Sequence, residues 1–415
     1  MINSFIRSFI KESFTLFPKL RFKEFDDDWS PYVLKDFVSF RKGKGISKAD
    51  ISENGINECI RYGELYTTYG QVIDHIHSKT NVSKSECILS KAGDVIIPAS
   101  GETQIDIATA SCVLHDDIIL SGDLNILSHE ENGSWLAYYL SSAKKLEIAQ
   151  LAQGNSVVHL YSSQLKDLKI NKPSKEEQTK IASFLSNVDE KISQLTQKLE
   201  LLSQYKQGMM QKLFSQQIRF RADDGSEFGE WETTTLGQTG KFIGGGTPSK
   251  ENSEFWEGSI PWISSSDLTE ESIFKINITR FISQNALNQS ATKLVPANSI
   301  LIVSRVGVGK VAITPNEICT SQDFTSLTLH KGSSIFFAYL IKSLTPYLLE
   351  MNQGTSIKGF IKDDLANLEL KIPCIEEQTQ IANFLSAIDQ KIEVVAQQIE
   401  HAKQWKKGLL QQMFV

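Results

Sequence analysis

The chain has 415 residues, 40% of them apolar, which is enough for two or three domains with hydrophobic cores. Its formal net charge of −6 excludes a protein that is polycationic as a whole, and no apolar run reaches the length of a membrane span. The five cysteines are odd in number and never form a Cys-x-x-Cys pair. This usage predicts reduced, buried thiols in a cytoplasmic protein that does not associate with a membrane.

The chain contains one long segment twice. Residues 173–214 and 373–414 align without a gap at an offset of 200, and 20 of the 42 positions are identical. The match continues upstream, where QGNSVVHLYSSQLKDLKINKP corresponds to QGTSIKGFIKDDLANLELKIP. A duplication therefore predicts an α+β fold in which two small globular mixed α/β domains are each followed by a long helix. The predicted order is an N-terminal segment (1–19), a first domain (20–172), a central helix (173–217), a second domain (218–372) and a distal helix (373–415).

The N-terminal segment is apolar but carries Arg7, Lys11 and Glu12 inside its apolar region and lacks a small-residue cleavage site, which indicates an amphipathic segment and not a secretory signal. After it, Leu20-Arg21-Phe22 matches Ile218-Arg219-Phe220, which follows the central helix. The distal helix ends the chain without such a continuation. We therefore expect residues 1–19 to pack near the C-terminal end of the distal helix and to close a circular, pseudo-two-fold arrangement.

The first domain mixes short strand-like runs, such as Asp94–Pro98 and Asp117–Leu120, with a helix expected over Ser134–Ala143. It also contains a basic, glycine-containing loop and a turn-rich stretch with planar rings, which suit phosphates and base edges. A solvated surface loop and a plain strand are the alternatives for these stretches. The candidate DNA contacts are Arg41, Lys42, Lys44, Lys48, Arg61, Tyr62, Tyr66, Thr68 and Tyr69.

Both copies of the repeated segment predict a helix of roughly 60 Å with an apolar residue every 3.5 positions on average. Ordinary core packing is the alternative to a coiled coil, but two equivalent stripes favour pairing with each other, antiparallel about a local two-fold axis. Each seam also carries a lysine (Lys206, Lys406) and, two residues later, a glycine (Gly208, Gly408), which suggests a close crossing or a bend. The predicted seam residues are Ile181, Leu185, Val188, Ile192, Leu195 and Leu199, with Ile381, Leu385, Ile388, Ile392, Val395 and Ile399 in the second copy.

The second domain has a strand-like run at Ser299–Val303 and a helix expected over Ser334–Ser343. In that helix, Tyr339–Leu340 matches Tyr139–Leu140 of the first domain. A glycine-rich loop with hydroxyls and one cation again suits DNA, and an arginine bidentate to guanine would be the strongest single base contact. The candidates are Gly245, Gly246, Thr247, Ser249, Lys250, Trp262, Ser264, Ser265 and Arg305.

Catalytic and metal-binding motifs are missing from the sequence. The ten prolines are never adjacent, which excludes the Pro-Pro loop of common adenine methyltransferases. The stretch from Ser304 resembles a P-loop but has Ser for the first glycine and Val311 after Lys310. His75 and His77 are not followed by a second ligand pair at zinc spacing. We therefore predict no catalytic residue, no metal site and no cofactor in this chain.

The charge of the domains argues against tight DNA binding by the chain alone. Residues 20–172 carry 16 Lys and Arg against 21 Asp and Glu, and residues 220–372 carry 13 against 17. Proteins that grip DNA through their own phosphate contacts are normally basic. If the chain binds DNA, local basic loops and a partner protein must supply the attraction, and binding should be steep in salt.

At the level of motifs, the chain resembles the specificity subunit of type I restriction–modification enzymes. The resemblance rests on the doubled P-x-x-EEQ-x-x-IA-x-FLS-x-x-D-x-KI helices, the QGxS stretch before each, and the LRF and IRF entry segments. It also rests on the openings GKGISKADI…IRYGELYT and GGGTPSKENSEFWEGSIPWISSSDL. It covers nearly the whole chain.

This resemblance implies that each globular domain is a target-recognition domain for one half of a bipartite, asymmetric site on double-stranded DNA. The helix pair would set the gap and dock two methyltransferase (modification) subunits, and restriction motor-nuclease subunits would join them. S-adenosylmethionine, Mg and ATP would belong to those partners, so that this chain is the non-catalytic reader. Two readings remain as alternatives: a coiled-coil scaffold that presents two protein-binding domains without DNA, and a catalytic subunit.

Overall fold

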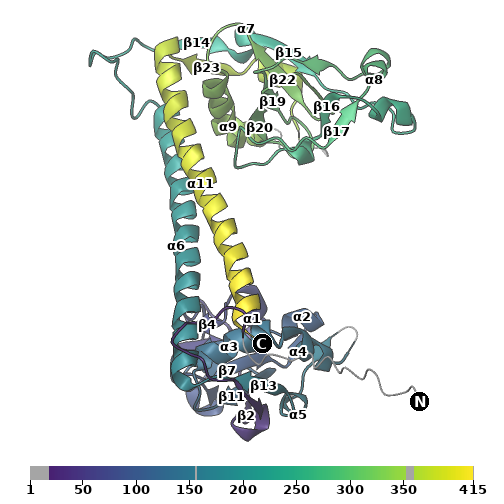
Figure 1. Ribbon diagram of the computed structural model, residues 1–415. Coiled ribbons are helices and arrows are strands. Elements are labelled where there is room, and N and C mark those ends of the chain that lie inside the picture. Colours follow the sequence, from purple (N-terminus) through teal and green to yellow (C-terminus); the bar gives the residue numbers. More distant parts are fainter. Residues whose placement is uncertain (1–17, 155–156, 352–358, 415) are drawn as a thin grey trace, which may run out of the picture. The chain divides into compact units, whose positions relative to one another are not determined.

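The computed structural model describes residues 18–154, 157–351 and 359–414, and the chain divides into two compact units. Unit 1 extends to Leu195 and includes the chain from Gln398 onward, whereas unit 2 comprises Thr196–Gln397. Each unit therefore contains one globular domain and one end of both long helices, α6 (Lys175–Phe214) and α11 (Ile375–Met413) (Figure 1). No helix in these described ranges is long and apolar enough to cross a membrane.

The globular domain of unit 1 is built on two sheets with the strand orders β5-β3-β10-β6 and β2-β11-β7-β9-β4, plus two short strand pairs, β1-β13 and β12-β8. Its strands are β1 (Ser30–Val33), β2 (Ser39–Lys42), β3 (Asn57–Ile60), β4 (Val72–Ile73), β5 (Ser78–Thr80), β6 (Ile88–Leu89), β7 (Val95–Pro98), β8 (Ser100–Gly101), β9 (Ser111–Val113), β10 (Ile119–Leu120), β11 (Leu124–Ser128), β12 (Val158–His159) and β13 (Lys169–Lys172). Its helices are α1 (Glu64–Thr67), α2 (Gln104–Ile107), α3 (Gly133–Ser142), α4 (Lys145–Leu151) and α5 (Ser162–Leu165).

The globular domain of unit 2 has sheets with the strand orders β17-β16-β21-β18 and β15-β22-β19-β20, and the pair β14-β23. Its strands are β14 (Glu232–Thr235), β15 (Gly240–Gly244), β16 (Ile260–Ile263), β17 (Arg280–Ile282), β18 (Leu294–Val295), β19 (Ile300–Ile302), β20 (Val311–Ile313), β21 (Ile318–Thr320), β22 (Thr325–Leu329) and β23 (Glu369–Ile372). Its helices are α7 (Leu236–Thr239), α8 (Gln284–Gln289), α9 (Ser334–Met351) and α10 (Lys362–Ala366).

The two globular domains share one frame although their sequences differ. The order β5-β3-β10-β6 corresponds strand for strand to β17-β16-β21-β18, and each sheet has one parallel pair at the same place, β3 with β10 and β16 with β21. The sheets β2-β11-β7-β9-β4 and β15-β22-β19-β20 and the pairs β1-β13 and β14-β23 correspond as well, with β4 and the pair β12-β8 as additions in the described part of unit 1. Equivalent main-chain hydrogen bonds run from Ser121 N–H to the Ile60 carbonyl (3.0 Å) and from Ser321 N–H to the Ile263 carbonyl (2.9 Å). The duplication inferred from the helices therefore includes the domains.

Both domains require a glycine at one equivalent position of this frame, and for the same physical reason. A Cβ atom added to Gly43 would lie 1.9 Å from the Ser121 carbonyl oxygen, and one added to Gly245 would lie 1.9 Å from the Ser321 carbonyl oxygen. Such a contact is impossible, so only glycine lets the strand approach its neighbour here. The glycine-containing loops of the two domains therefore begin at equivalent glycines, which close packing requires.

The predicted elements are found close to their expected positions. Strand β7 lies within Asp94–Pro98, β10 covers the second half of Asp117–Leu120, and β19 lies within Ser299–Val303. The two short helices are α3 and α9, of which α9 extends to Met351 and contains Pro346. All twelve predicted seam residues of the long helices are buried or half-buried. Within unit 1 the start of α6 packs against the end of α11, and within unit 2 the reverse holds, so the helices are antiparallel.

Each globular domain is fastened to the start of a long helix by an arginine. Arg21 donates from Nε and Nη2 to both carboxylate oxygens of Glu177, at 2.7 Å each, and Glu177 is only 1% exposed. Arg219 makes the same pair with Glu377, at 3.0 and 2.7 Å. The carboxylate of Glu177 thus binds Arg21, while the Glu177 N–H donates to the Ser174 hydroxyl (3.3 Å), so that only one half of a capping box forms at this helix start.

The entry segments also make equivalent contacts at the helix ends. The Leu20 N–H donates to the Gln412 carbonyl (2.9 Å), and the Ile218 N–H donates to the Lys212 carbonyl (3.3 Å), so a segment from the start of the chain takes the place of the missing continuation. Residues 1–17, on which the prediction of circular closure mainly falls, lie outside the described residues. The same is true of all four residues of the QGTS stretch before the distal helix.

The sequence alignment misplaces one pair of counterparts. Tyr138, and not Tyr139, donates its hydroxyl to Asp189 on α6 (2.6 Å), as Tyr339 does to Asp389 on α11 (2.5 Å). The reason is one extra residue in unit 2: α9 starts 13 positions after Ser321, whereas α3 starts 12 positions after the equivalent Ser121. Tyr139 instead packs its ring against Trp135 and Phe414 in the core of unit 1.

The seam lysines form ion pairs inside each unit. Lys206 lies 2.5 Å from Asp389 and Lys406 lies 2.5 Å from Asp189, and the two aspartates are the ones that accept from the tyrosines. The close crossing expected at the glycines is not found. A Cβ atom added at Gly208 or Gly408 would meet nothing within 4 Å, so neither glycine is required by packing inside the chain.

The two ion pairs differ in burial, which predicts unequal costs for the same substitution. The side chains of Lys206 and Asp389 are 8% and 7% exposed, whereas those of Lys406 and Asp189 are 16% and 33% exposed. Asp389→Asn should therefore destabilise unit 2 by about 3 kcal/mol because it leaves a buried ammonium without its carboxylate. Asp189→Asn should cost unit 1 clearly less. Urea unfolding of both variants, followed by hydrogen exchange in each unit, measures this; equal costs would contradict it.

A half-buried lysine beside this network predicts a pH dependence of unit 2. Lys342 donates to the Glu270 carbonyl, and burial, aided by Lys206, lowers its pKa to about 8 from 10.5. Between these values the unfolded chain holds a proton that the folded chain has released, so stability rises with pH across this window. Lys342→Met should remove that rise and stabilise the protein at pH 7 by on the order of 2 kcal/mol.

Denaturant titrations between pH 7 and 10.5 check this expectation. Lys275→Met, at an exposed lysine of the same unit, is the matched control and should keep the pH dependence of the wild-type protein. A rise that is the same in Lys342→Met and in the wild type would show that other groups cause it.

Candidate nucleic-acid interface

The basic loop of the first domain contains one arginine held by the protein and three free lysines. Arg41 lies on β2 and its Nη2 is 2.5 Å from the buried carboxylate of Asp94, with further hydrogen bonds to Ser128 and to the Leu89 carbonyl. The three lysines of this stretch are exposed and make no ion pair within the described ranges: Lys42, Lys44 and Lys48. These lysines can approach phosphates, whereas Arg41 fastens β2 to β7.

The turn-rich stretch after β3 is organised by a buried glutamate. Glu64, 5% exposed, accepts from the side chain of Arg61 (2.9 Å), from the Arg61 N–H (2.8 Å) and from the Ser78 hydroxyl. Tyr69 accepts from the His77 N–H (2.9 Å), and burial raises the pKa of Tyr69 to about 12. These residues shape the stretch. The remaining candidates lie half-buried or exposed along it: Tyr62, Tyr66 and Thr68.

The glycine-rich loop of the second domain is partly a packing feature. A Cβ atom at Gly246 would lie 2.4 Å from the Ala291 backbone, which excludes a side chain there as well as at Gly245. Thr247 donates to Gln322 (2.5 Å), while Ser249 and Lys250 are exposed.

Trp262 lies in the core of the second domain. It is only 3% exposed, its indole N–H donates to the Gly246 carbonyl (3.0 Å), and the guanidinium of Arg280 covers its ring at 4.7 Å. This leaves the indole no free face for a DNA base, so we assign Trp262 a packing role.

The serine run after β16 lies against the connection between β19 and β20. Ser264 accepts from Arg280 (2.7 Å), and the Ser265 carbonyl accepts from Lys310 (3.1 Å). A Cβ atom at Gly307 would lie 3.8 Å from Ser265, which places the two loops side by side. The structure thus brings Ser264 and Ser265 close to the loop that carries Arg305, a candidate 40 positions further along the chain. Arg305 is exposed.

Several apolar side chains outside the predicted candidates are exposed. Large apolar side chains stand in solvent at Ile105 (46% exposed), Tyr161 (56%), Val306 (69%) and Ile361 (66%). Tyr161 and Ile361 are counterparts, since each follows the residue that hydrogen-bonds the loop after β7 or β19. The only sequence signal for them is an apolar residue inside a turn-rich, polar segment, which predicts a buried position as readily as an exposed one.

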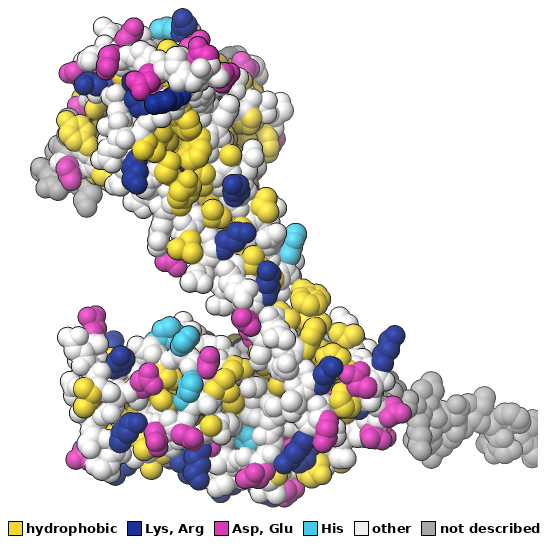
Figure 2. Space-filling model, turned by 90° about the vertical axis from the view of Figure 1, so that its left-hand side faces the viewer, with side chains coloured by type: hydrophobic (Ala, Val, Ile, Leu, Met, Phe, Trp, Pro, Cys, Tyr) yellow, Lys and Arg dark blue, Asp and Glu magenta, His cyan; other side chains and the backbone are white. Residues whose placement is uncertain are grey.

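Cations do not gather into one surface on the face of the molecule drawn in Figure 2. Lys and Arg side chains there alternate with Asp and Glu over both globular domains. This agrees with the excess of carboxylates in each domain, and it leaves single lysines and arginines on loops as the sources of local positive charge.

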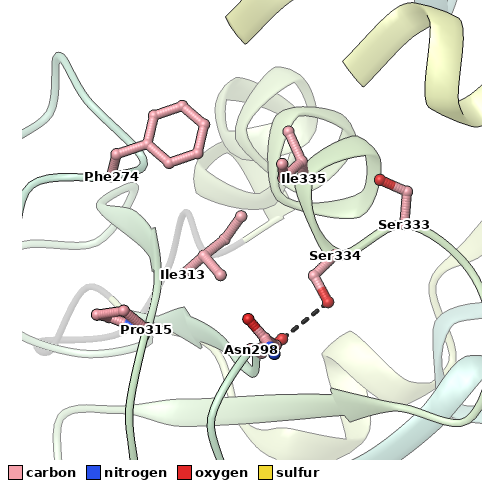
Figure 3. A pocket seen from close by; sticks show the side chains of 7 residues that line it. All are labelled: Phe274, Asn298, Ile313, Pro315, Ser333, Ser334 and Ile335. Atoms are coloured by element: carbon pink, nitrogen blue, oxygen red, sulfur yellow. Dashed lines mark hydrogen bonds between the residues drawn. The ribbon is translucent and has the colours of Figure 1, made fainter. Parts of the chain in front are cut away.

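A pocket in unit 2 lies away from the predicted residues. It has a volume of about 430 Å³ and lies between the start of α9, β20 and the loop at Phe274 (Figure 3). The Ser334 hydroxyl donates to the Asn298 carbonyl at its edge (2.8 Å). None of its lining side chains is charged, and the described residues contain no group of three or more His, Cys, Asp or Glu suited to a metal ion. The lining residues are Phe274, Asn298, Ile313, Pro315, Ser333, Ser334 and Ile335.

Comparison with known proteins agrees with this geometry. The family model described as "Type I restriction modification DNA specificity domain" matches residues 26–204 and again residues 229–404. A Methanocaldococcus jannaschii protein, provisionally named the specificity subunit of type I restriction enzyme MjaX, is 26% identical over 95% of this chain and 94% of its own length. The EcoR124I/EcoR124II specificity subunit of Escherichia coli is 36% identical over 39% of this chain and 41% of its own length.

A solved structure shares the fold of the whole chain. The crystal structure of the S subunit of a type I restriction–modification system from M. genitalium has a TM-score of 0.62 and covers 96% of this chain and 99% of its own, at 17% sequence identity. The family model matches both halves of the chain separately, in agreement with the duplicated frame. The chain belongs to the specificity subunits of type I restriction–modification systems and carries two target-recognition domains.

Proposed function

We propose that this chain is the non-catalytic DNA reader of a methyltransferase and endonuclease complex, with each target-recognition domain reading one half of a bipartite, asymmetric site. The helix pair sets the gap between the half-sites and docks two modification subunits, and restriction motor-nuclease subunits join that assembly. S-adenosylmethionine, Mg and ATP belong to those partners, and the complex works in the cytoplasm.

One observation carries this proposal: a common frame supports two different sets of loops. The strand order and the loop-anchoring hydrogen bonds are the same in both domains, whereas the exposed side chains on the loops differ in charge and shape. Two copies of one scaffold that present different surfaces suit the same task on two different targets. Base recognition depends on such side chains, because phosphates look alike at every sequence.

The long helices supply candidate positions for the two modification subunits. Tyr205 and Trp405 are counterparts, and both are about half exposed (51% and 55%) although they are large aromatic side chains. Gly208 and Gly408 lie one turn further along each helix and have open space where a Cβ would be. Because neither glycine is required inside the chain, its presence in both copies fits a close approach by an identical partner at each helix. Two equivalent faces would bind two copies of that partner.

We expect the chain, produced with its modification subunits in a methylation-free host, to direct N6-adenine methylation to a bipartite motif with a fixed gap. Exchange of residues 20–172 for those of a relative should change one half of the motif and leave the other half and the gap unchanged. Genome-wide mapping of N6-methyladenine measures both results.

The same experiment separates the alternatives. A complex that forms but yields no methylation, and whose binding to DNA shows no salt-sensitive shift, would support a protein-binding scaffold and contradict the reader. Methylation or cleavage of DNA by the purified chain alone would contradict the non-catalytic assignment.

The helix glycines give a second prediction with two opposite readouts. Gly208→Ala and Gly408→Ala should each stabilise the isolated chain by about 0.5–1 kcal/mol, because alanine favours the helix and meets no atom. The same substitutions should weaken binding of the modification subunits, since a methyl group stands in the path of a close partner. Thermal unfolding and titration calorimetry measure the two effects. Stabilisation with unchanged binding would place the docking surface elsewhere.

A further inference from the structure

Among the described residues, one arginine differs from the others because it has no partner within this part of the chain. Six of the seven pair with a carboxylate, and Arg305 alone makes neither an ion pair nor a side-chain hydrogen bond within those residues. Arg305 is also exposed. A guanidinium offers five N–H donors in a fixed fork, and at Arg305 all of them are available to a ligand from outside. The paired arginines are Arg21, Arg41, Arg61, Arg219, Arg221 and Arg280.

The backbone that carries Arg305 is held firmly. Ser304, directly before it, is buried, its N–H donates to the Asp323 carbonyl (2.8 Å), and its carbonyl accepts from the Phe360 N–H (2.9 Å). Its hydroxyl lies 3.0 Å from that of Thr325, and the Val303 N–H donates to the Lys310 carbonyl (3.0 Å) to close the loop. Because the loop base is already ordered, the cost of ordering on binding is confined to the side chain of Arg305.

The loop presents an apolar side chain next to the guanidinium. Val306 is 69% exposed, and Gly307 and Gly309 turn the chain back with φ angles of +85° and +103°. A cationic fork beside a branched apolar group matches the major-groove edge of DNA, where guanine offers the O6 and N7 acceptors and a neighbouring thymine offers its methyl group. A bare phosphate would use the fork but not the exposed valine.

The equivalent connection in the first domain has the opposite charge. The Ala99 N–H donates to the Asp123 carbonyl (2.7 Å) and its carbonyl accepts from Leu160 (3.0 Å), as at Ser304, so Ala99 is the counterpart of Ser304. The connection from there to β9 contains no Lys or Arg, and Glu102 on it is exposed and forms no ion pair in the described part of the chain. A carboxylate repels the acceptor edge of guanine. The two domains therefore present side chains of opposite charge on equivalent connections of their common frame.

We propose that Arg305 is a specificity-determining residue that reads a guanine in the half-site of the second domain through a bidentate contact, with Val306 packing on the adjacent base. The connection between β19 and β20 is then the base-reading element of that domain. This inference rests on the proposed function and adds the identity of one base and the residue that selects it.

The test uses the complete methyltransferase complex, with residues 20–172 exchanged in a parallel sample to identify which half-site belongs to the second domain. N6-methyladenine is mapped for the wild type, Arg305→Ala, Arg305→Lys and the control Arg221→Ala. Arg221 is an exposed arginine of the same unit that lies before β14 and pairs with Glu227 at 3.5 Å. Competition binding with DNA altered at each guanine of the second half-site gives the affinities.

We expect Arg305→Ala to lose preference for one guanine of the second half-site by about 10- to 100-fold, with the first half-site and the gap unchanged. Arg305→Lys should lose most of that preference too, because lysine keeps the charge but not the planar fork. Arg221→Ala should methylate the wild-type motif.

Three results would overturn the assignment of Arg305: a second half-site without guanine, full guanine preference in Arg305→Ala, or an equal loss of affinity for all sequences, which is the mark of a phosphate contact. They differ from a failure of the proposed function itself, in which the wild-type complex would already yield no bipartite motif.

Discussion

The pairing of an arginine with a buried glutamate at the start of each long helix is the contact on which each unit depends. Glu377 is fully buried and also accepts from the Trp231 indole N–H (3.2 Å), so its carboxylate is satisfied only if Arg219 and Trp231 are both in place. A buried carboxylate without its cation would cost several kcal/mol, which makes this contact an all-or-none link between a domain and its helix. The same link at Arg21 and Glu177 ties residues 156 positions apart in the chain.

This use of arginine inside the protein explains how a DNA-reading chain can carry a net negative charge. Carboxylates such as Asp94 and Glu64 neutralise Arg41 and Arg61, which are arginines that a count of cations would assign to DNA. In the described part of the chain, the cations without a carboxylate partner are lysines and Arg305, and several of them lie on loops. Long-range attraction to DNA from such a surface is weak, so affinity has to come from the assembled complex, while the choice of sequence comes from a few side chains.

Much of the fold could be predicted from the sequence because the repeated helix has a strong period and the duplication doubles each signal. The seam and the approximate helix bounds follow from it. What could not be predicted depends on exact spacing or on burial. One extra residue before α9 moves the tyrosine that meets Asp389, and no alignment at a fixed offset shows that shift. Trp262 and Arg61 have the residue types of a DNA contact, yet Trp262 is buried in the core and the guanidinium of Arg61 is paired with Glu64.

The frame and the loops are subject to separate physical limits, and this separation allows target choice to change without loss of the fold. Gly43 and Gly245 cannot accept a side chain, because a Cβ would collide with a carbonyl of the adjacent sheet, so this point of the frame must remain glycine. Between Ser304 and β20, by contrast, the chain is anchored at its two ends, and the exposed side chains between them contact little else. A substitution there costs little stability, since surface changes away from packed or paired groups have small effects. Different base-contacting side chains can therefore follow the same anchored backbone, as Glu102 and Arg305 do in the two halves of this chain.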